Sequence, residues 1–517
     1  MAIQRALVSV FEKEGIVDFC RELDRLGIEI ISSGGTSKLL SENKIKNIEV
    51  SSITGFPEMM DGRVKTLHPK IHGGILADRS KKNHIEDAKK NKIGLIDLVV
   101  VNLYPFEKTI SKKDVKIEEA IENIDIGGPT LVRAAAKNYK NVVIVCNPYR
   151  YGEILEEIKK GGVSENTKKM LAVEAFEHIS HYDVVIENYL RKTFEILDYP
   201  KYLNSSFNKI NDLRYGENNH QTAAFYKDGD VGFSLPNSRK LQGKELSYNN
   251  ILDGNSAFEI VRNFGEPTAV VLKHNNPCGV ATRKTIEEAY DVAFSGDPKA
   301  AFGGIIALNR EVGKKLSEKI CSSFIEVVIA PGFSKEALEI FKTKEKIRLL
   351  DIGKPKFPIV RENHKVYRSI VGGMLIQDVD KLDYDEEKLT IVSKREPNKE
   401  EIEDLLYAWK ISKYVVSNSV VYVKNRATVG IGAGQMKRVD SAKIAGMVAK
   451  EYGRDLKGCC MASEAFLPFR DAIDEAAEVG VTAVIQPGGS IRDKEVIDAV
   501  NEHKMAMLFT GIRHFKH

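Results

Sequence analysis

A nearly continuous apolar segment from Leu95 to Leu103 constrains the fold of this chain more than any other feature. Strands that helices cover on both faces have such runs, whereas strands with one solvated face alternate apolar and polar residues. Shorter strand-like runs lie at Ala6 to Val10, Ile28 to Ser32 and Asn141 to Cys146, and Ile16 to Leu26 has a helical spacing of apolar residues. This alternation predicts an α/β domain with a parallel sheet between two layers of helices.

A helical pattern closes this first domain. It runs from Tyr151 to Leu197, and Ser164 is a suitable N-cap for its longest part. Pro200 and the polar residues 204–211 interrupt the pattern, so we place the domain boundary between residues 199 and 200. The apolar residues expected on one face of the helix are Met170, Leu171, Val173, Phe176, Ile179, Tyr182, Val185, Ile186 and Tyr189.

The second domain, residues 200–517, also mixes strands with helices. Its length of more than 300 residues suggests two α/β subdomains, although no internal repeat is evident in the sequence. The strands predicted most clearly are Thr268 to Leu272, Gly304 to Leu308, Val420 to Val423 and Ala483 to Gln486.

The charge balance argues against a nucleic-acid-binding protein. The 517 residues include 77 basic and 73 acidic side chains, for a net charge of +4, whereas nucleic-acid binders show a large basic excess on one face. Six scattered cysteines without a C-x-x-C pair indicate a reducing compartment. No run approaches the roughly 18 apolar residues of a membrane span, and no signal-peptide core is evident. We therefore expect a cytoplasmic protein without membrane contacts.

Two motifs of the first domain favour an anion-binding site. Ser33 to Thr36 places two glycines between a strand and a helix, where backbone N–H groups and the helix start can hold a phosphate. Arg63 to Lys70 collects three basic side chains, a hydroxyl and a histidine, a set that suits a phosphate or a developing oxyanion. A tight turn and a solvated loop are the alternatives for these two segments.

Two further motifs lie where ligands approach an α/β sheet. Asn102 to Phe106 ends a buried strand, and ligands of open sheets bind at the carboxyl ends of strands. An ordinary half-buried aromatic is the alternative for Tyr104. Asp125 to Gly128 precedes a helix whose end, Arg133 to Asn138, packs three alanines before Lys137. The double glycine predicts close approach by a ligand.

In their order and spacing, these motifs resemble the inosine monophosphate (IMP) cyclohydrolase domain of the bifunctional purine biosynthesis enzyme family. The resemblance implies a methylglyoxal-synthase-like fold for residues 1–199 and catalytic roles for four residues. Asp125 and Lys137 would transfer protons, and Lys65 and Tyr104 would stabilise the oxyanion and position the substrate. Phe11 departs from the family, which usually has a serine there. The residues implied to bind the nucleotide are Glu12, Lys13, Ser33, Gly34, Gly35, Thr36, Arg63, Thr66, Asn102 and Ile126.

In the second domain, Lys273 and His274 follow an apolar strand. A histidine is a suitable base near neutral pH, and a structural histidine is the alternative. Pro277-Cys278 is similar to part of the zinc-deaminase signature P-C-x-x-C, but Ala281 stands where the second cysteine belongs. We therefore expect no metal.

Further segments extend the resemblance to the family's other half, the aminoimidazole carboxamide ribonucleotide (AICAR) transformylase, so that it covers the whole chain. This half implies a duplicated cytidine-deaminase-like fold without the metal, with His274 as general base and Lys273 stabilising the formyl oxyanion. Two departures are Asn219, where the family commonly has proline, and Glu326, where some members have aspartate. The segments concerned are Leu213 to Gln221, Leu272 to Gly279, Ala301 to Gly304, Ala330 to Gly332, Ser417 to Val420, Gly430 to Gln435, Phe466 to Asp471, Gln486 to Ser490 and Arg513 to Phe515.

The transformylase resemblance also assigns ligands. It implies 10-formyltetrahydrofolate as co-substrate and a homodimer with sites built across the interface. The residues implied to bind the ribonucleotide are Arg214, Tyr215, Gly303, Glu326, Asn418 and Arg438. Those implied to bind the folate are Phe466, Asp471, Ser490, Ile491 and Arg513.

The sequence thus predicts an enzyme that formylates AICAR and then closes the formylated product (FAICAR) to IMP. A nucleotide-sensing regulatory protein built on the first domain is one alternative, because fold alone does not fix function. A nucleobase deaminase is another, against which the missing zinc ligand and the balanced charge argue.

Overall fold

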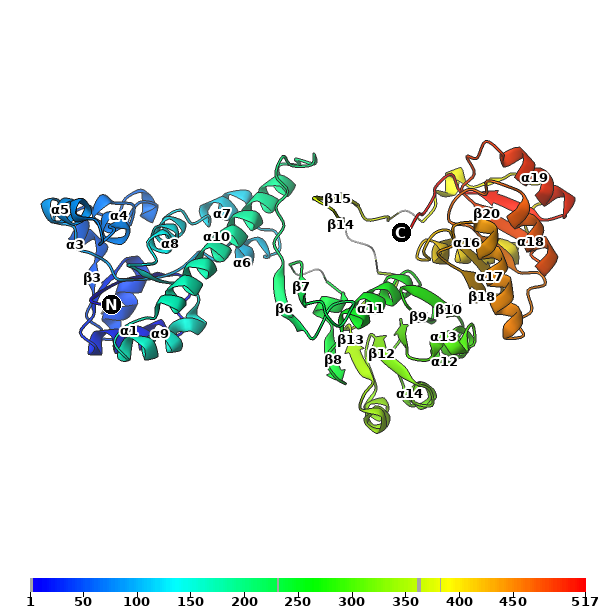
Figure 1. The fold of residues 1–517 in the computed structure, drawn as a ribbon, viewed down its shortest axis with the longest axis horizontal. Helices are drawn as coiled ribbons and strands as arrows, with labels where there is room; N and C mark the ends of the chain where they lie inside the picture. The colour runs from blue at the N-terminus through cyan, green and yellow to red at the C-terminus, as the bar shows by residue number, and fades with distance from the viewer. Residues whose placement is uncertain (1–2, 230–231, 360–363, 382) are drawn as a thin grey trace. The chain divides into compact units, whose positions relative to one another are not determined.

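The computed structural model describes residues 3–229, 232–359, 364–381 and 383–517 (Figure 1). The chain forms two compact units, Met1–Ser206 and Phe207–His517. The division lies seven residues beyond the predicted boundary, after the end of helix α10 (Glu165–Thr193). No helix among the described residues has the length and apolar character needed to span a bilayer.

The first unit is built on a five-stranded parallel sheet in the order β3-β2-β1-β4-β5. All five residues of β4 are buried, as the apolar run predicted. The strands are β1 (Arg5–Val10), β2 (Glu29–Ser32), β3 (Ile48–Glu49), β4 (Leu98–Asn102) and β5 (Val143–Val145). The helices are α1 (Ile16–Arg25), α2 (Gly34–Glu42), α3 (Val50–Thr54), α4 (Pro69–Leu76), α5 (Lys82–Lys90), α6 (Phe106–Ile110), α7 (Ile117–Glu122), α8 (Gly127–Lys137), α9 (Tyr151–Lys159) and α10.

Helix α10 differs from its predicted form in one respect. Ser164 caps it as predicted, because its hydroxyl accepts a hydrogen bond from the Thr167 N–H at 3.1 Å. However, the expected apolar residues do not form one buried face: Leu171, Ile179 and Tyr182 are buried, whereas Met170, Val173 and Phe176 are exposed. At about 100° per residue, the exposed positions lie on a different side of the helix from the buried ones.

The second unit contains two six-stranded mixed sheets with the same topology. Their orders are β10-β9-β11-β12-β13-β8 and β18-β17-β19-β20-β21-β16. In each order, the first two strands form an antiparallel hairpin, and the third strand is antiparallel to the second. The third, fourth and fifth strands are parallel to one another, and the sixth, at the edge, is antiparallel to the fifth. The duplication implied by the family resemblance is thus present in the strand order.

The first sheet consists of β8 (Arg239–Gln242), β9 (Thr268–Lys273), β10 (Asn276–Thr282), β11 (Gly304–Leu308), β12 (Ile325–Ala330) and β13 (Arg348–Asp351). The second consists of β16 (Thr390–Ile391), β17 (Val420–Val423), β18 (Thr428–Gly432), β19 (Cys460–Ala462), β20 (Ala483–Gln486) and β21 (Ala506–Phe509). Two separate hairpins are β6 (Asn208–Leu213) with β7 (Ala223–Lys227), and β14 (Lys365–Ile370) with β15 (Gly373–Asp378).

Helices pack on both faces of each sheet of the second unit. A single apolar core joins the inner faces of the two sheets through α11 (Tyr248–Val261) and α16 (Lys399–Ser412). Two outer cores cover the opposite faces. The remaining helices are α12 (Ile286–Phe294), α13 (Pro298–Ala301), α14 (Lys314–Cys321), α15 (Lys335–Phe341), α17 (Arg438–Glu451), α18 (Asp471–Val479) and α19 (Asp493–Glu502).

Candidate functional sites

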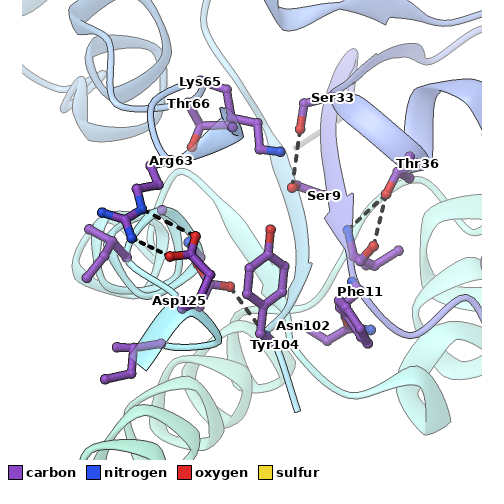
Figure 2. Close-up of a pocket in the computed structure, with 18 of the residues that line it drawn as sticks. Ser9, Phe11, Ser33, Thr36, Arg63, Lys65, Thr66, Asn102, Tyr104 and Asp125 are labelled. Carbon is purple, nitrogen blue, oxygen red and sulfur yellow. Dashed lines mark hydrogen bonds and ion pairs between the residues drawn. The ribbon is translucent and has the colours of Figure 1, made fainter. Parts of the chain in front are cut away.

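A pocket of about 590 Å³ lies at the carboxyl ends of β1, β2 and β4 in the first unit (Figure 2). Ligands of open α/β sheets bind at this edge. The structure therefore brings together, from five separate segments, most of the residues implied for ring closure and nucleotide binding. Those that line the pocket are Lys13, Ser33, Gly35, Thr36, Arg63, Lys65, Thr66, Asn102, Tyr104, Asp125 and Ile126.

Side chains from β4 and α2 fix the loop that follows β1. Asn102 Oδ1 accepts hydrogen bonds from the N–H groups of Phe11 and Glu12, at 2.5 and 3.0 Å. The Thr36 hydroxyl accepts a hydrogen bond from the Lys13 ammonium at 2.8 Å. These contacts hold the Lys13 ammonium against the pocket wall.

Two ammonium groups give the pocket a positive character. Burial and the nearby charge of Lys65 lower the pKa of Lys13. Gly34, at φ 51°, lets the loop approach Lys65, since a Cβ there would lie 3.4 Å from the Lys65 Nζ. Glu58 Oε1 lies 3.4 Å from that Nζ, and Glu58 is exposed. Such a pair of cations favours a bound anion such as a phosphate.

Asp125 is the buried acidic group of the pocket. Its Oδ1 accepts a hydrogen bond from the Gly128 N–H at 2.8 Å, and its Oδ2 accepts one from the Tyr104 N–H at 3.4 Å. Burial raises the pKa of Asp125, although these two hydrogen bonds and the charge of Lys65 oppose the rise. A carboxyl group with a raised pKa in a pocket is suited to proton transfer.

Phe11 forms an aromatic wall of the pocket at the position where the family usually has a serine. Its ring meets the Tyr104 ring edge-on, with 5.2 Å between centroids and 69° between planes. In Figure 2 the Tyr104 hydroxyl and the Lys65 ammonium both point into the pocket. Phe11 therefore supports one side of the tyrosine that the resemblance assigns to catalysis.

Three predicted residues do not line this pocket. Gly34 lies between two residues that line the pocket. Glu12 also lies between two such residues, and its carboxylate forms an ion pair with Lys108. Lys137 is exposed and is the last residue of α8, whose first residue, Gly127, lines the pocket. At 1.5 Å per residue these helix ends are about 15 Å apart.

Sequence reasoning missed two polar residues of the pocket wall. The carboxylate of Glu122 forms an ion pair with Arg63, and the Ser9 and Ser33 hydroxyls are 3.5 Å apart. Glu122 is the last residue of α7, three residues before Asp125, and no local pattern distinguishes it from a solvated glutamate. Ser9 is a polar residue among the apolar residues of β1, and this local pattern does not indicate that its hydroxyl lies near Ser33.

In the second unit, Lys273 and His274 lie at a tight turn between β9 and β10. His274 and Asn275 have left-handed backbones, with φ of 51° and 60°. This conformation costs a residue with a side chain roughly 1–2 kcal/mol, least for Asn, Asp and His. The Lys273 ammonium donates a hydrogen bond to the Phe302 carbonyl at 2.8 Å, and the His274 side chain is exposed.

Two further predicted residues lie at the same end of this sheet. Gly303 immediately precedes β11, and Glu326 is the second residue of the neighbouring strand β12. The Gly303 N–H donates to the Phe324 carbonyl at 2.7 Å. Glu326 Oε2 accepts a hydrogen bond from the Asn250 amide at 2.8 Å. Lys273, Gly303 and Glu326 thus lie at the same end of three adjacent strands, β9, β11 and β12.

Arg214 and Tyr215 lie in the loop between β6 and β7. The Arg214 guanidinium lies 5.7 Å from the centroid of the Tyr215 ring. The Glu217 carbonyl accepts a hydrogen bond from the Asn249 amide at 3.4 Å, so this loop lies near the start of α11.

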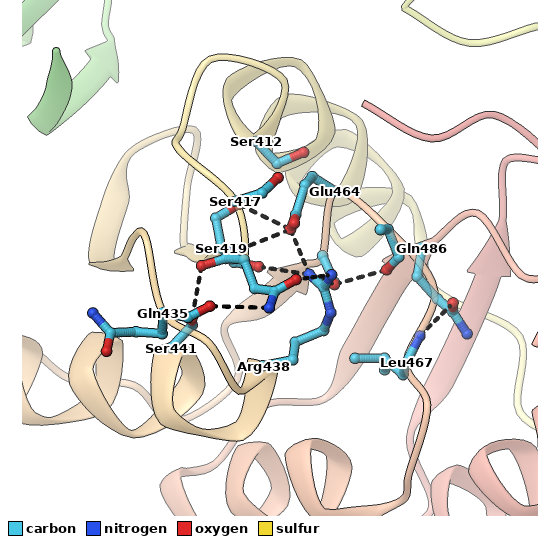
Figure 3. A network of polar contacts seen from close by, with 12 residues as sticks. Ser412, Ser417, Ser419, Gln435, Arg438, Ser441, Glu464, Leu467 and Gln486 are labelled. Carbon is cyan, nitrogen blue, oxygen red and sulfur yellow. Dashed lines mark hydrogen bonds and ion pairs between the residues drawn. The ribbon is translucent and has the colours of Figure 1, made fainter. Parts of the chain in front are cut away.

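A second pocket of about 390 Å³ is lined by four predicted residues, Asn418, Arg438, Phe466 and Asp471. Arg438 donates to Glu464 Oε2 at 2.6 Å and to Asn418 Oδ1 at 2.7 Å (Figure 3). The exposed fractions of the Arg438 and Glu464 side chains are 6% and 0%. This buried ion pair, which sequence reasoning did not identify, fixes the guanidinium at the pocket wall.

Three residues implied to bind folate lie outside this pocket. Ser490 and Ile491 belong to the loop between β20 and α19, and Ile491 is fully exposed. The Arg513 guanidinium lies 4.9 Å from the centroid of the Phe515 ring, and Phe515 lines the pocket.

The described residues contain no group of three or more histidine, cysteine and acidic side chains arranged to hold a metal ion. Burial raises the pKa of the Cys278 thiol to about 12, so this thiol is protonated at neutral pH.

Comparisons with known proteins identify the family. The chain is 51% identical over 519 aligned residues, covering 100% of both chains, to the bifunctional purine biosynthesis protein PurH of Bacillus subtilis (strain 168). Residues 135–448 match the AICARFT/IMPCHase bienzyme family, and residues 15–130 match the MGS-like domain. The chain belongs to the AICARFT/IMPCHase bienzyme family. The resemblance drawn from the motifs is confirmed, and the full-length match does not favour the nucleotide-sensing alternative.

A solved structure, "Crystal structure of ForH", is also similar to this member of the AICARFT/IMPCHase family. It is 29% identical and covers 36% of this chain and 95% of its own. Its TM-score of 0.34 is too low to inform the fold.

Proposed function

We propose that this chain carries out the last two steps of IMP synthesis, formyl transfer in the second unit and ring closure in the first. Membership of a bienzyme family over its whole length is the observation that carries this function. The assignment of each step to a unit rests on the two sets of side chains described above.

Ring closure requires the carboxamide nitrogen of FAICAR to attack the formyl carbon, followed by loss of water. The buried Asp125 carboxyl takes up and returns the protons of this sequence, as its raised pKa favours. Lys65 and Tyr104 face the formyl oxygen, which gains negative charge when the new bond forms. Lys13 and the loop from Ser33 to Thr36 hold the phosphate.

The role implied for Lys137 stays a prediction. The lysine lies at the opposite end of α8 from Gly127 and is not among the residues that line the pocket. Loss of ring closure in Lys137→Ala, with formyl transfer retained, is the result that the family resemblance leads us to expect.

Formyl transfer joins the substrate amine to the formyl carbon and releases the reduced folate. His274 removes the proton of the attacking amine, and Lys273 stabilises the oxyanion on the formyl group. The ribonucleotide lies against Arg214, Tyr215, Gly303, Glu326, Asn418 and Arg438. The formyl donor lies against Phe466, Asp471, Ser490, Ile491 and Arg513.

The formyltransferase activity requires a folate-type formyl donor, and we propose 10-formyltetrahydrofolate. We also propose that the enzyme is a cytoplasmic homodimer whose transformylase sites use residues of both copies.

One product analysis tests both assignments. Purified enzyme is mixed with AICAR and 10-formyltetrahydrofolate, and the products are separated by mass spectrometry. Wild type forms IMP, Asp125→Asn accumulates FAICAR, and His274→Ala forms neither product but still converts added FAICAR to IMP. If a folded single variant loses both activities, the assignment of the two steps to separate sites is wrong.

A further inference from the structure

The two halves of the second unit hold equivalent hairpin turns with equivalent helix carboxylates. In the first half, Asp253 of α11 accepts hydrogen bonds from the N–H groups of His274 and Asn275, at 3.2 and 2.8 Å. In the second half, Asp404 of α16 accepts them from Asn425 and Arg426, at 2.7 and 2.6 Å. All four turn residues have φ between 51° and 60°.

The correspondence continues along the chain at a constant separation of 151 residues. Asp253 and Asp404 are so separated, as are the helix N-caps Ser247 and Asn398. Lys273 and Lys424 precede the two turns and donate to equivalent backbone carbonyls, those of Phe302 and Lys457, at 2.8 and 2.7 Å.

The two hairpins also share an irregularity. The register of β10 against β9 shifts between Pro277 and Gly279, and that of β18 against β17 shifts after Thr428, which is 151 residues beyond Pro277. The same hairpin backbone is therefore present in both halves. Differences between the two hairpins in their side chains can then be related to differences in function.

The side chains proposed to react, Lys273 and His274, lie in the first half, and the second half lacks the histidine. The second turn has Asn425 where the first has His274, and the Lys424 ammonium is paired with Asp455 at 2.7 Å. The first turn has an additional contact, because the Ser256 hydroxyl donates to Asn275 Oδ1 at 2.9 Å. In the second half, Tyr407 stands at the position of Ser256.

We propose that Asp253 is a positioning residue for formyl transfer, acting by fixing the backbone of the Lys273–His274 turn; this inference rests on the function proposed above. Its two oxygens accept both N–H groups of the turn, so neither turn residue can rotate without breaking a charge-assisted hydrogen bond. The direction of the His274 Cα–Cβ bond follows from that backbone. Asp253 touches no reacting atom and exerts its effect through His274.

Asp253→Asn tests the proposal, and Asp404→Asn is its matched control. Each amide keeps one acceptor oxygen and presents an NH₂ group to the second N–H, so each turn loses one of its two anchors. A displacement of about 1 Å at a reacting group can slow a reaction roughly 100-fold. We expect Asp253→Asn to lower the kcat of formyl transfer by about 30-fold or more, with the KM for AICAR changed less than about threefold.

The control separates positioning from stability. Asp404→Asn should lower the melting temperature at least as much, because Asp404 is the more buried carboxylate, yet leave formyl transfer within about twofold of wild type. Ring closure of added FAICAR should be unchanged in both variants. Equal kcat values for the two variants would overturn the proposal.

Two further variants make the outcome decisive. If His274→Ala retains formyl transfer, the base role proposed for His274 fails, and the positioning role of Asp253 fails with it; if His274→Ala is inactive while Asp253→Asn matches wild type, only the positioning role fails. Should Asp253→Asn not accumulate as folded protein, Ser256→Ala decides instead. That variant removes the other anchor of the turn, and a kcat within about twofold of wild type would overturn the inference.

Discussion

Gly128→Ala should selectively damage ring closure. A Cβ at this position would lie 2.5 Å from Asp125 Oδ2 and 2.6 Å from Leu103 Cδ2, well inside ordinary contact distances. Leu103 is packed in the buried core. The Asp125 carboxylate lies at the pocket edge, where it accepts hydrogen bonds from two backbone N–H groups. We therefore expect the Asp125 carboxylate, rather than the Leu103 side chain, to shift. The substitution therefore moves the carboxylate that we assign to proton transfer.

The substitution has two opposing effects on the free energy of unfolding and one effect on the rate of ring closure. Overpacking costs about 1–3 kcal/mol, and replacing glycine by alanine inside a helix returns about 1 kcal/mol, so the free energy of unfolding should fall by about 0–2 kcal/mol. Displacing a reacting group by about 1 Å can slow ring closure roughly 100-fold, or about 2.7 kcal/mol of activation free energy. Activity should thus suffer more than stability.

The assay follows conversion of purified FAICAR to IMP, with formyl transfer and the melting temperature measured on the same samples. Gly152→Ala in α9 is the control, since a Cβ there meets no atom within 4 Å and should be neutral or stabilising. The reasoning is refuted if Gly128→Ala closes the ring within about threefold of wild type while Asp125→Asn does not.

Two further predictions concern charged pairs. The side-chain hydrogen bond with Glu107 raises the pKa of His181, so its contribution to stability is complete below the unfolded value of 6.5 and is lost as pH rises through the folded pKa. His181→Gln should therefore lower the melting temperature more at pH 6 than at pH 9, and a pH-independent difference would contradict this. Arg438→Met leaves the buried Glu464 unpaired and should lower the free energy of unfolding by about 3–5 kcal/mol, measured by denaturant titration. Combining it with Glu464→Gln should recover part of the loss, and strict additivity would contradict the pairing.

Much of the fold could be predicted because its signals are local. The buried strand β4 is an apolar run, and the cap of α10 is a serine at a helix start. The pocket of the first unit was predictable from motif order, because parallel strands carry their following loops to one edge of the sheet. Tyr104 directly follows β4, whereas Lys65 and Asp125 lie in the longer connections after β3 and β4, and all three line the pocket.

Other features depend on contacts that the sequence does not display. The repeat in the second unit is carried by turn geometry and helix caps, and Ser247 and Asn398 perform the same capping role with different side chains. The Arg438–Glu464 pair joins residues from distant segments without a motif. Lys137 shows the opposite case, in which a residue close to a pocket motif in sequence lies at the far end of the connecting helix.

The core shared by α11 and α16 has a consequence for how the second unit folds. Trp409 and Phe258 lie in one apolar cluster with residues from the inner faces of both sheets, and each is less than 2% exposed. A chain that ended between the two halves would leave the inner face of the first sheet open to water, a large apolar surface that promotes association. We therefore expect the two halves, which share one strand order, to unfold together as one cooperative unit, and we expect the inner face of the first half to stay uncovered during synthesis until the second half has formed.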